Sequence, residues 1–116
     1  PKKFPMEQVC EFLKYNLEDI TSVKEWAEAM GRTRAHFSRR FKAIFGITPA
    51  KKMAAIRRAV LQELIQGNTE CPSELLATKL GFKNAKSLCR YICRHYGTSL
   101  TEMREKARKR KWMQKW

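Results

Sequence analysis

Apolar residues recur along this chain at the spacing of helices rather than strands. Near the N-terminus, Met6, Val9, Cys10, Leu13 and Leu17 fall three or four positions apart or side by side, which places them on one face of a helix. The same period returns in six later stretches, so we predict an all-α chain of about seven helices. The later stretches span residues 23–30, 33–45, 49–67, 73–80, 85–96 and 98–116.

Polar residues, proline and glycine mark the ends of these predicted helices. Ser22 and Glu25 form an S-x-x-E capping box, and Thr33 and Asn84 stand where an N-cap is expected. Pro49 occupies the first position of the long helix 49–67, where its missing N–H costs nothing. The predicted helix ends carry Gly31, Gly46, Gly67, Gly81 and Gly97.

Two halves of the chain repeat the same plan. The pattern Trp26-Ala27-x-x-Met30-Gly31 returns fifty positions later as Leu76-Ala77-x-x-Leu80-Gly81. Similarly, Phe37-x-Arg39-x-Phe41 returns as Leu88-x-Arg90-x-Ile92 after fifty-one positions. A small residue where two helices cross, followed four positions later by a turn glycine, is typical of a helix-turn-helix unit. We predict two such units, residues 6–46 and 73–104, joined by a linker helix 49–67 and followed by a basic C-terminal extension, residues 105–116.

The apolar positions of each second helix predict which face turns inward. Phe37 and Phe41, with Ile44 or Phe45, form this face in the first unit, and Leu88, Ile92 and Tyr96 form it in the second. The outer face of such a helix is the one that enters a DNA major groove. Our candidate DNA-binding residues are Arg34, Ala35, His36, Ser38, Arg39 and Lys42 in the first unit, and Ala85, Lys86, Ser87, Cys89, Arg90 and Arg94 in the second.

The charge distribution agrees with a polyanionic partner. The chain carries a formal net charge of +14, with nine basic residues and no acid from Ala29 to Gln62. Five more basic residues and no acid lie from Leu75 to Thr101. Nucleic acid, an acidic membrane surface or an acidic protein would each offset this charge. Arg39 and Arg90 hold equivalent places where a guanidinium can bind guanine, although a salt bridge within each hairpin is an alternative role.

At these residues the chain resembles the DNA-binding domain of the AraC/XylS family of bacterial transcription regulators, over residues 6–104. The resemblance rests on Trp26-Ala27, Met30-Gly31, Phe37-x-Arg39-x-Phe41-Lys42 and Gly46-Ile47-Thr48-Pro49, and on the second copy with Gly81-Phe82, Arg90, Gly97 and Arg104. The chain departs from the family pattern in its second half. The departures are Lys86 for Ser, Leu88 and Ile92 for Phe, Leu100 for Pro and Met103 for Tyr.

This resemblance implies two helix-turn-helix subdomains, with helices 33–45 and 85–96 reading two successive major grooves of double-stranded DNA to control transcription. We also expect a cytoplasmic, nucleoid-associated protein, because cysteines without a disulfide framework indicate a reducing cytoplasm. RNA polymerase, and an N-terminal sensing or dimerisation domain absent from this chain, are further partners that the family suggests.

Two other functions stay open from the sequence. One is architectural DNA binding without sequence preference, and the other is binding of a membrane or an acidic protein through the basic extension 105–116. We expect no membrane span and no enzyme, because no apolar run is long enough to cross a bilayer and no catalytic constellation is present. The four cysteines lack the spacing of a disulfide framework or a zinc site, so we expect free thiols, no metal and no cofactor.

Overall fold

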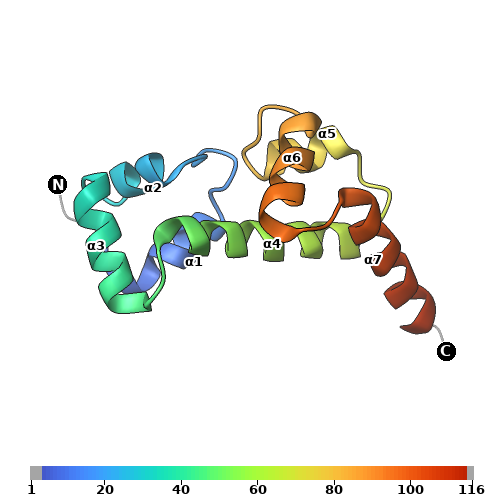
Figure 1. Ribbon diagram of the computed structural model, residues 1–116, viewed down its shortest axis with the longest axis horizontal. Helices are drawn as coiled ribbons and strands as arrows, with labels where there is room; N and C mark the ends of the chain where they lie inside the picture. Colours follow the sequence, from blue (N-terminus) through green and yellow to red (C-terminus); the bar gives the residue numbers. More distant parts are fainter. Residues whose placement is uncertain (1–3, 115–116) are drawn as a thin grey trace. The chain divides into compact units, whose positions relative to one another are not determined.

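The computed structural model describes residues 4–114. Within that range every element of regular secondary structure is a helix. The elements in chain order are the short 3₁₀ helix η1 (Met6–Gln8), α1 (Val9–Lys14), α2 (Val23–Ala29), α3 (Arg34–Phe45), α4 (Pro49–Gly67), α5 (Ser73–Lys79), α6 (Ala85–Tyr96) and α7 (Leu100–Gln114). The predicted all-α class with seven α-helices is confirmed (Figure 1). None of the helices within residues 4–114 combines the length and apolar character that a membrane crossing requires.

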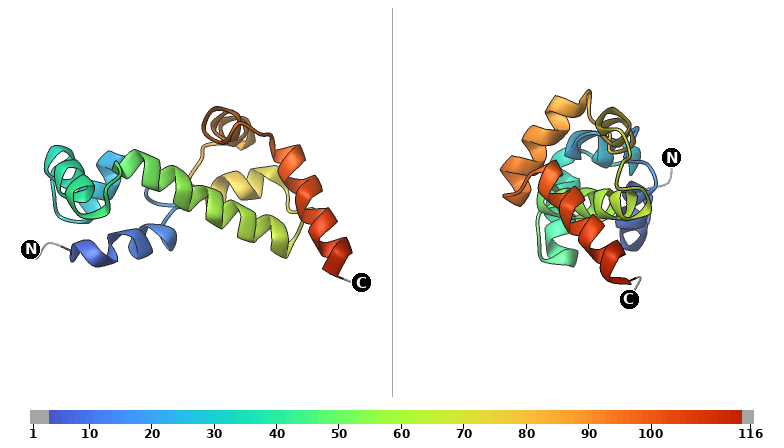
Figure 2. Two further views of the ribbon diagram at one scale, coloured as in Figure 1. Left: turned by 60° about the horizontal axis from the view of Figure 1, so that its bottom comes forward. Right: turned by 90° about the vertical axis from the view of Figure 1, so that its right-hand side faces the viewer.

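The contacts between residues divide the chain into two units, one ending at Arg57 and the other starting at Arg58. The division falls inside α4, which runs as one uninterrupted helix (Figure 2) and supplies residues to both units. In the first unit α2 packs against α3, and in the second α5 packs against α6. Each pair is a helix-turn-helix, as the internal repeat predicts.

An aromatic cluster forms the core of the first unit. Trp26 is fully buried and meets Phe37 and Phe41 edge-on, with ring centroids 5.1 and 5.3 Å apart. Its indole Nε1–H donates a hydrogen bond of 3.1 Å to the Val9 carbonyl, so the polar edge of the ring is satisfied inside the core. Ala27 is also fully buried, which agrees with a close crossing of α2 and α3 at a small side chain.

The second unit builds the same crossing from aliphatic residues. Leu76, Ala77, Leu88 and Ile92 are at most 1% exposed, and they occupy the places of Trp26, Ala27, Phe37 and Phe41 in the repeat. The second-half departures at Leu88 and Ile92 therefore keep the apolar core and change only the shape of its side chains.

The predicted helix starts are confirmed by their hydrogen bonds. The side-chain oxygens of Ser22, Thr33 and Asn84 accept from the backbone N–H three residues later, at 3.2, 3.2 and 2.9 Å. Each bond satisfies one of the orphan donors at a helix N-terminus. The last helix begins at Leu100, where the Ser99 hydroxyl accepts from the Glu102 N–H at 3.1 Å. A proline is therefore not needed to start it.

The turn between the two helices of each unit depends on glycine. Gly31 and Gly81 have φ values of 78° and 82°, in the left-handed region that residues with a Cβ rarely adopt. In both turns the residue after the turn glycine donates back to the buried alanine, from Arg32 N to Ala27 O and from Phe82 N to Ala77 O. The crossing alanine and the turn glycine thus belong to one local structure.

One predicted helix end differs in the structure, and one choice that the sequence left open is decided. The first helix was expected to extend to Leu17, but α1 ends at Lys14 because the Asn16 side-chain amide donates to the Phe12 carbonyl at 2.7 Å. Leu17 is still buried, at 3% exposure, from a turn. At the end of α3 the inward residue is Phe45, which contacts Phe41, whereas Ile44 is 50% exposed.

The predicted helix 98–116 is helical in the structure from Leu100 through Gln114, so it includes most of the basic extension 105–116. Arg108 and Glu70 form an ion pair of 2.8 Å that ties its middle to the loop before α5. The last part of the extension, residues 115–116, lies outside the described residues.

We expect Gly81→Val to lower the free energy of unfolding by more than about 1 kcal/mol, because an L residue in the left-handed region costs on the order of 1–2 kcal/mol and β-branching adds to it. Gly67→Ala is the matched control in the same unit, since Gly67 lacks a positive φ and an added Cβ meets nothing within 4 Å. Urea denaturation of both variants measures the difference, and equal midpoints would show that the turn at Gly81 tolerates a side chain.

Candidate nucleic-acid interface

The outer face of α3 holds the candidate residues of the first unit. With Phe37 and Phe41 buried against α2, the helix turns Arg34, Ala35, Arg39 and Lys42 to solvent, and His36 and Ser38 are half-buried. The structure thus brings all six predicted residues onto one helix and leaves four of them exposed. Their placement follows directly from the inward aromatic face.

The outer face of α6 carries the second set. Lys86, Cys89, Arg90 and Arg94 are exposed, whereas Ala85 and Ser87 are half-buried at the start of the helix. The N–H of Ala85 donates to Glu74 Oε2 at 3.2 Å, so a carboxylate from α5 already occupies this amide. An incoming anion would therefore compete with Glu74 for the Ala85 N–H.

Sequence reasoning missed Cys93 on the same face. It is exposed, and the fifty-one-residue offset that pairs Arg39 with Arg90 also pairs Lys42 with Cys93 and Ser38 with Cys89. The repeat could therefore have identified Cys93 as an outer-face residue, because its equivalent Lys42 was a candidate DNA-binding residue in the first unit. The second unit presents two thiols where the first presents a hydroxyl and an ammonium group.

The arginines of the chain divide into two groups. Those in the first group bind the protein itself. The Arg32 guanidinium donates to the carbonyl of Phe4 at 2.8 Å, and the Arg57 guanidinium, 6% exposed, donates to the carbonyl of Thr21 at 2.9 Å. Arg104 plays a comparable part in the second unit, where it donates to the Thr69 carbonyl at 2.6 Å. These side chains fix the segments that lead into α2, α3 and α5.

Arg39 and Arg90 belong to the second group. Both are exposed, and neither makes a hydrogen bond or an ion pair with any residue of the described range 4–114. The alternative in which they tie each hairpin together by a salt bridge is therefore not what the structure shows. A guanidinium with five unused donors on a helix surface is available for a bidentate acceptor such as a phosphate or a guanine edge.

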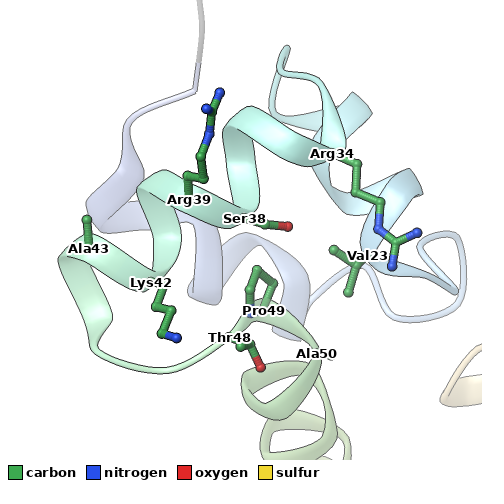
Figure 3. Close-up of a pocket in the computed structure, with 9 residues that line it drawn as sticks. All are labelled: Val23, Arg34, Ser38, Arg39, Lys42, Ala43, Thr48, Pro49 and Ala50. Carbon is green, nitrogen blue, oxygen red and sulfur yellow. The ribbon is translucent and has the colours of Figure 1, made fainter.

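A groove of about 690 Å³ opens beside α3, α4 and the start of α2 (Figure 3). Arg34 and Lys42 extend from α3 on either side of Ser38, which faces Pro49 at the start of α4. Val23, Ala43, Pro49 and Ala50 give the groove an apolar lining. The residues of the described range 4–114 that line it include Arg34, Arg39 and Lys42 and no carboxylate. Such a surface suits a partner with phosphates on its edge and apolar atoms between them.

Other kinds of site lack a basis in the described residues. Among residues 4–114, no group of three or more His, Cys, Asp or Glu side chains lies close enough to hold a metal ion. All four cysteines are free thiols, and the two on α6 are exposed. The outer faces of α3 and α6 therefore offer cations and hydrogen-bonding groups, and α6 adds two exposed thiols.

We expect Arg39→Ala to change the free energy of unfolding by less than about 0.5 kcal/mol, as for other exposed positions without partners. Arg32→Ala, in the same unit, should lower it by about 1.5–3 kcal/mol because charged hydrogen bonds to the carbonyls of Phe4 and Met30 are lost. Thermal unfolding of the two variants compares them. An equal loss in both would assign Arg39 a structural role.

Known proteins share this architecture. The DNA-binding domain of AdpA, a global transcriptional factor solved in complex with a target DNA, matches with a TM-score of 0.72 and 21% identity over 92% of this chain and 96% of that one. A transcriptional regulator with an AraC-type DNA-binding domain from Chromobacterium violaceum matches with a TM-score of 0.69 and 20% identity. The match covers 88% of this chain and 90% of that one. The C-terminal domain of AraT, a response regulator from Geobacillus stearothermophilus, matches with 0.73 and 18% over 91% and 88%.

No curated protein matches the chain significantly by sequence. The structural matches, at 18–21% identity, establish the fold. The sequence model of a helix-turn-helix domain family matches residues 26–106, which includes both turn glycines, both buried alanines and both outer-face arginines. This match covers more than half of the chain, and with it the chain belongs to the AraC-type helix-turn-helix domain family.

Proposed function

We propose that this chain is a transcriptional regulator that binds double-stranded DNA sequence-specifically through α3 and α6. The observation that carries the proposal is the pair of exposed arginines, Arg39 and Arg90, at equivalent positions of two helix-turn-helix units and without partners in residues 4–114. The AdpA domain, which shares the fold, was solved with its target DNA. The exposed arginines point to the outer faces of α3 and α6, and the AdpA complex supports DNA as the partner.

Each side chain has a role that its chemistry supports. The forks of Arg39 and Arg90 match the O6 and N7 acceptors that guanine presents in the major groove. Arg34, Lys42, Lys86 and Arg94 flank them and neutralise phosphates. The remaining candidates are small or polar: Ala35 and Ala85 permit close approach, and Ser38, Ser87, His36 and Cys89 offer hydrogen bonds or contacts to base edges.

The two units act as tandem readers in this proposal. Residues 6–46 and 73–104 would each place one helix in a major groove, with the grooves about one helical turn of DNA, roughly 34 Å, apart. The linker 49–67 connects them and residues 105–116 add positive charge. The proposal assigns no catalytic residue, cofactor, metal or membrane contact. It places the chain at the bacterial nucleoid in the cytoplasm, with RNA polymerase and a sensing or dimerisation domain as further partners.

Selection of bound sites from a random pool of DNA duplexes tests the proposal. We expect an enriched site with two recognition elements about one helical turn apart, and binding that weakens steeply as salt rises because counterions are released. If binding is salt-sensitive but no DNA sequence is enriched, the proposal is wrong and the chain is an architectural DNA binder without sequence preference. If Lys109→Gln with Arg110→Gln abolished all binding while Arg39→Ala left it intact, the basic extension would be the binding element.

We expect Arg39→Ala to cost about 1–3 kcal/mol of binding free energy at the selected site and to relax the preference at one or two base pairs. Arg40→Ala is the matched control: Arg40 is exposed next to Arg39 but one helix position round, so its loss should weaken binding to all duplexes alike. Competition binding with single-base variants of the site measures both. A uniform loss in Arg39→Ala would make Arg39 a phosphate contact.

A further inference from the structure

The exposed cysteines of this chain are concentrated on one surface. Cys89 and Cys93 lie on the outer face of α6 and are exposed, whereas Cys71 is buried and Cys10 in α1 is half-buried. Burial raises the pKa of the Cys10 thiol, with Lys52 opposing the shift, so Cys10 holds its proton more firmly than a free thiol does. Thiol reagents in solution therefore meet Cys89 and Cys93 first.

These two thiols sit among cations. They are four residues apart, with Arg90 directly after Cys89 and Arg94 directly after Cys93, and Lys86 lies on the same face one turn before Arg90. No acidic residue occurs from Leu75 to Thr101. Glu74 from α5 accepts a hydrogen bond from the N–H of Ala85, the first residue of this helix. An anionic reagent is therefore attracted to this surface.

The spacing of the thiols disfavours an internal disulfide. Side chains four residues apart on a helix have Cβ atoms about 5–6 Å apart, whereas a disulfide requires about 3.5–4.5 Å. Closing the bridge would require unwinding a turn of α6, whose inner residues Leu88 and Ile92 are buried. A mixed disulfide formed on one thiol is consequently not released by the other while the helix stays intact.

We propose that Cys89 and Cys93 form a thiol-modification site for anionic disulfides of the glutathione class, and that the resulting mixed disulfide switches off DNA binding by α6. The inference rests on the proposed function, because it names a way to regulate the α6 half of that same surface. The first unit has Ser38 and Lys42 at the equivalent positions, so the modification acts on the second unit alone.

The chemical step is thiol–disulfide exchange. The Cys89 or Cys93 thiol loses its proton to solvent, and its sulfur attacks one sulfur of glutathione disulfide. The disulfide bond of the reagent breaks, a new bond joins the protein sulfur to one glutathione, and the other glutathione leaves as a thiolate. The protein sulfur is oxidised and the departing glutathione is reduced, so no further reagent is required.

The adduct opposes DNA binding for two reasons. Bound glutathione brings a net negative charge beside Arg90, where a DNA phosphate or base edge would lie, and like charges at an interface are strongly unfavourable. The attached tripeptide also exceeds the space of a thiol on a helix that must enter the groove. The contacts made by α3 remain, so the modified chain should recognise only one of the two DNA sequence elements.

The test uses the full chain, oxidised glutathione and the duplex obtained by site selection. We expect peptide mass mapping to place the adduct on Cys89 or Cys93, and the Kd for the two-element site to rise at least about tenfold as a negative charge replaces favourable contacts. A reducing thiol should restore the original Kd. Comparing oxidised with reduced protein within each variant removes any effect of the substitution itself on binding.

The quantity compared is the Kd of the oxidised protein divided by the Kd of the reduced protein. In the double variant Cys89→Ser/Cys93→Ser this ratio should fall to near one, whereas the matched control Cys10→Ser should keep the wild-type ratio. An adduct that maps to Cys10 or Cys71, or a ratio near one in wild type despite complete modification of α6, would overturn the inference. If the reduced chain binds no duplex at all, the proposed function fails and the switch fails with it. The adduct map, made without DNA, decides the modification site separately.

Discussion

The close crossing of two helices at a buried alanine, locked by a left-handed glycine turn, is the constraint on which this surface depends. Ala27 and Ala77 are fully buried, and Gly31 and Gly81 hold nearly equal positive φ values. Once α3 and α6 are fixed in this way, their apolar faces must turn inward. The opposite faces, with Arg39 and Arg90, are then left at the surface by geometry rather than by any bond of their own.

The use of arginine separates stability from recognition. Arg32, Arg57 and Arg104 donate to backbone carbonyls and hold the segments around each helix-turn-helix. Arg39 and Arg90 make no hydrogen bond or ion pair within residues 4–114, so their charge and their N–H donors remain available to a partner. A chain with a net charge of +14 carries self-repulsion that a polyanion relieves. The unused donors and the net charge therefore both favour a polyanionic partner.

Much of the fold could be predicted from the sequence because its signals are local. The caps at Ser22, Thr33 and Asn84 act within three residues, and the repeat displays the crossing alanine and turn glycine twice. The bonds of Arg32 and Arg57 join residues 28 and 36 positions apart, so no local pattern announces them. The early end of α1 depends on one side-chain amide, at Asn16, competing for the Phe12 carbonyl.

The candidate surface was predictable to the extent that helix periodicity determines which residues face outward. Exposure of Arg39 and Arg90 follows from the inward rings and aliphatic side chains. The choice of Phe45 over Ile44 depends on contact with Phe41, which periodicity alone does not decide. The candidates in the second unit included Cys89 but not Cys93, whereas alignment of the two copies places Cys93 opposite Lys42.

The most direct test of the account is residue-resolved chemical-shift mapping of the full chain as a selected duplex is added at near-physiological salt. The account predicts that the largest shifts fall on the outer faces of α3 and α6, at residues 34–42 and 85–94, with the Arg39 and Arg90 side chains among them. Large shifts confined to residues 105–114, with α3 and α6 unchanged, would contradict it.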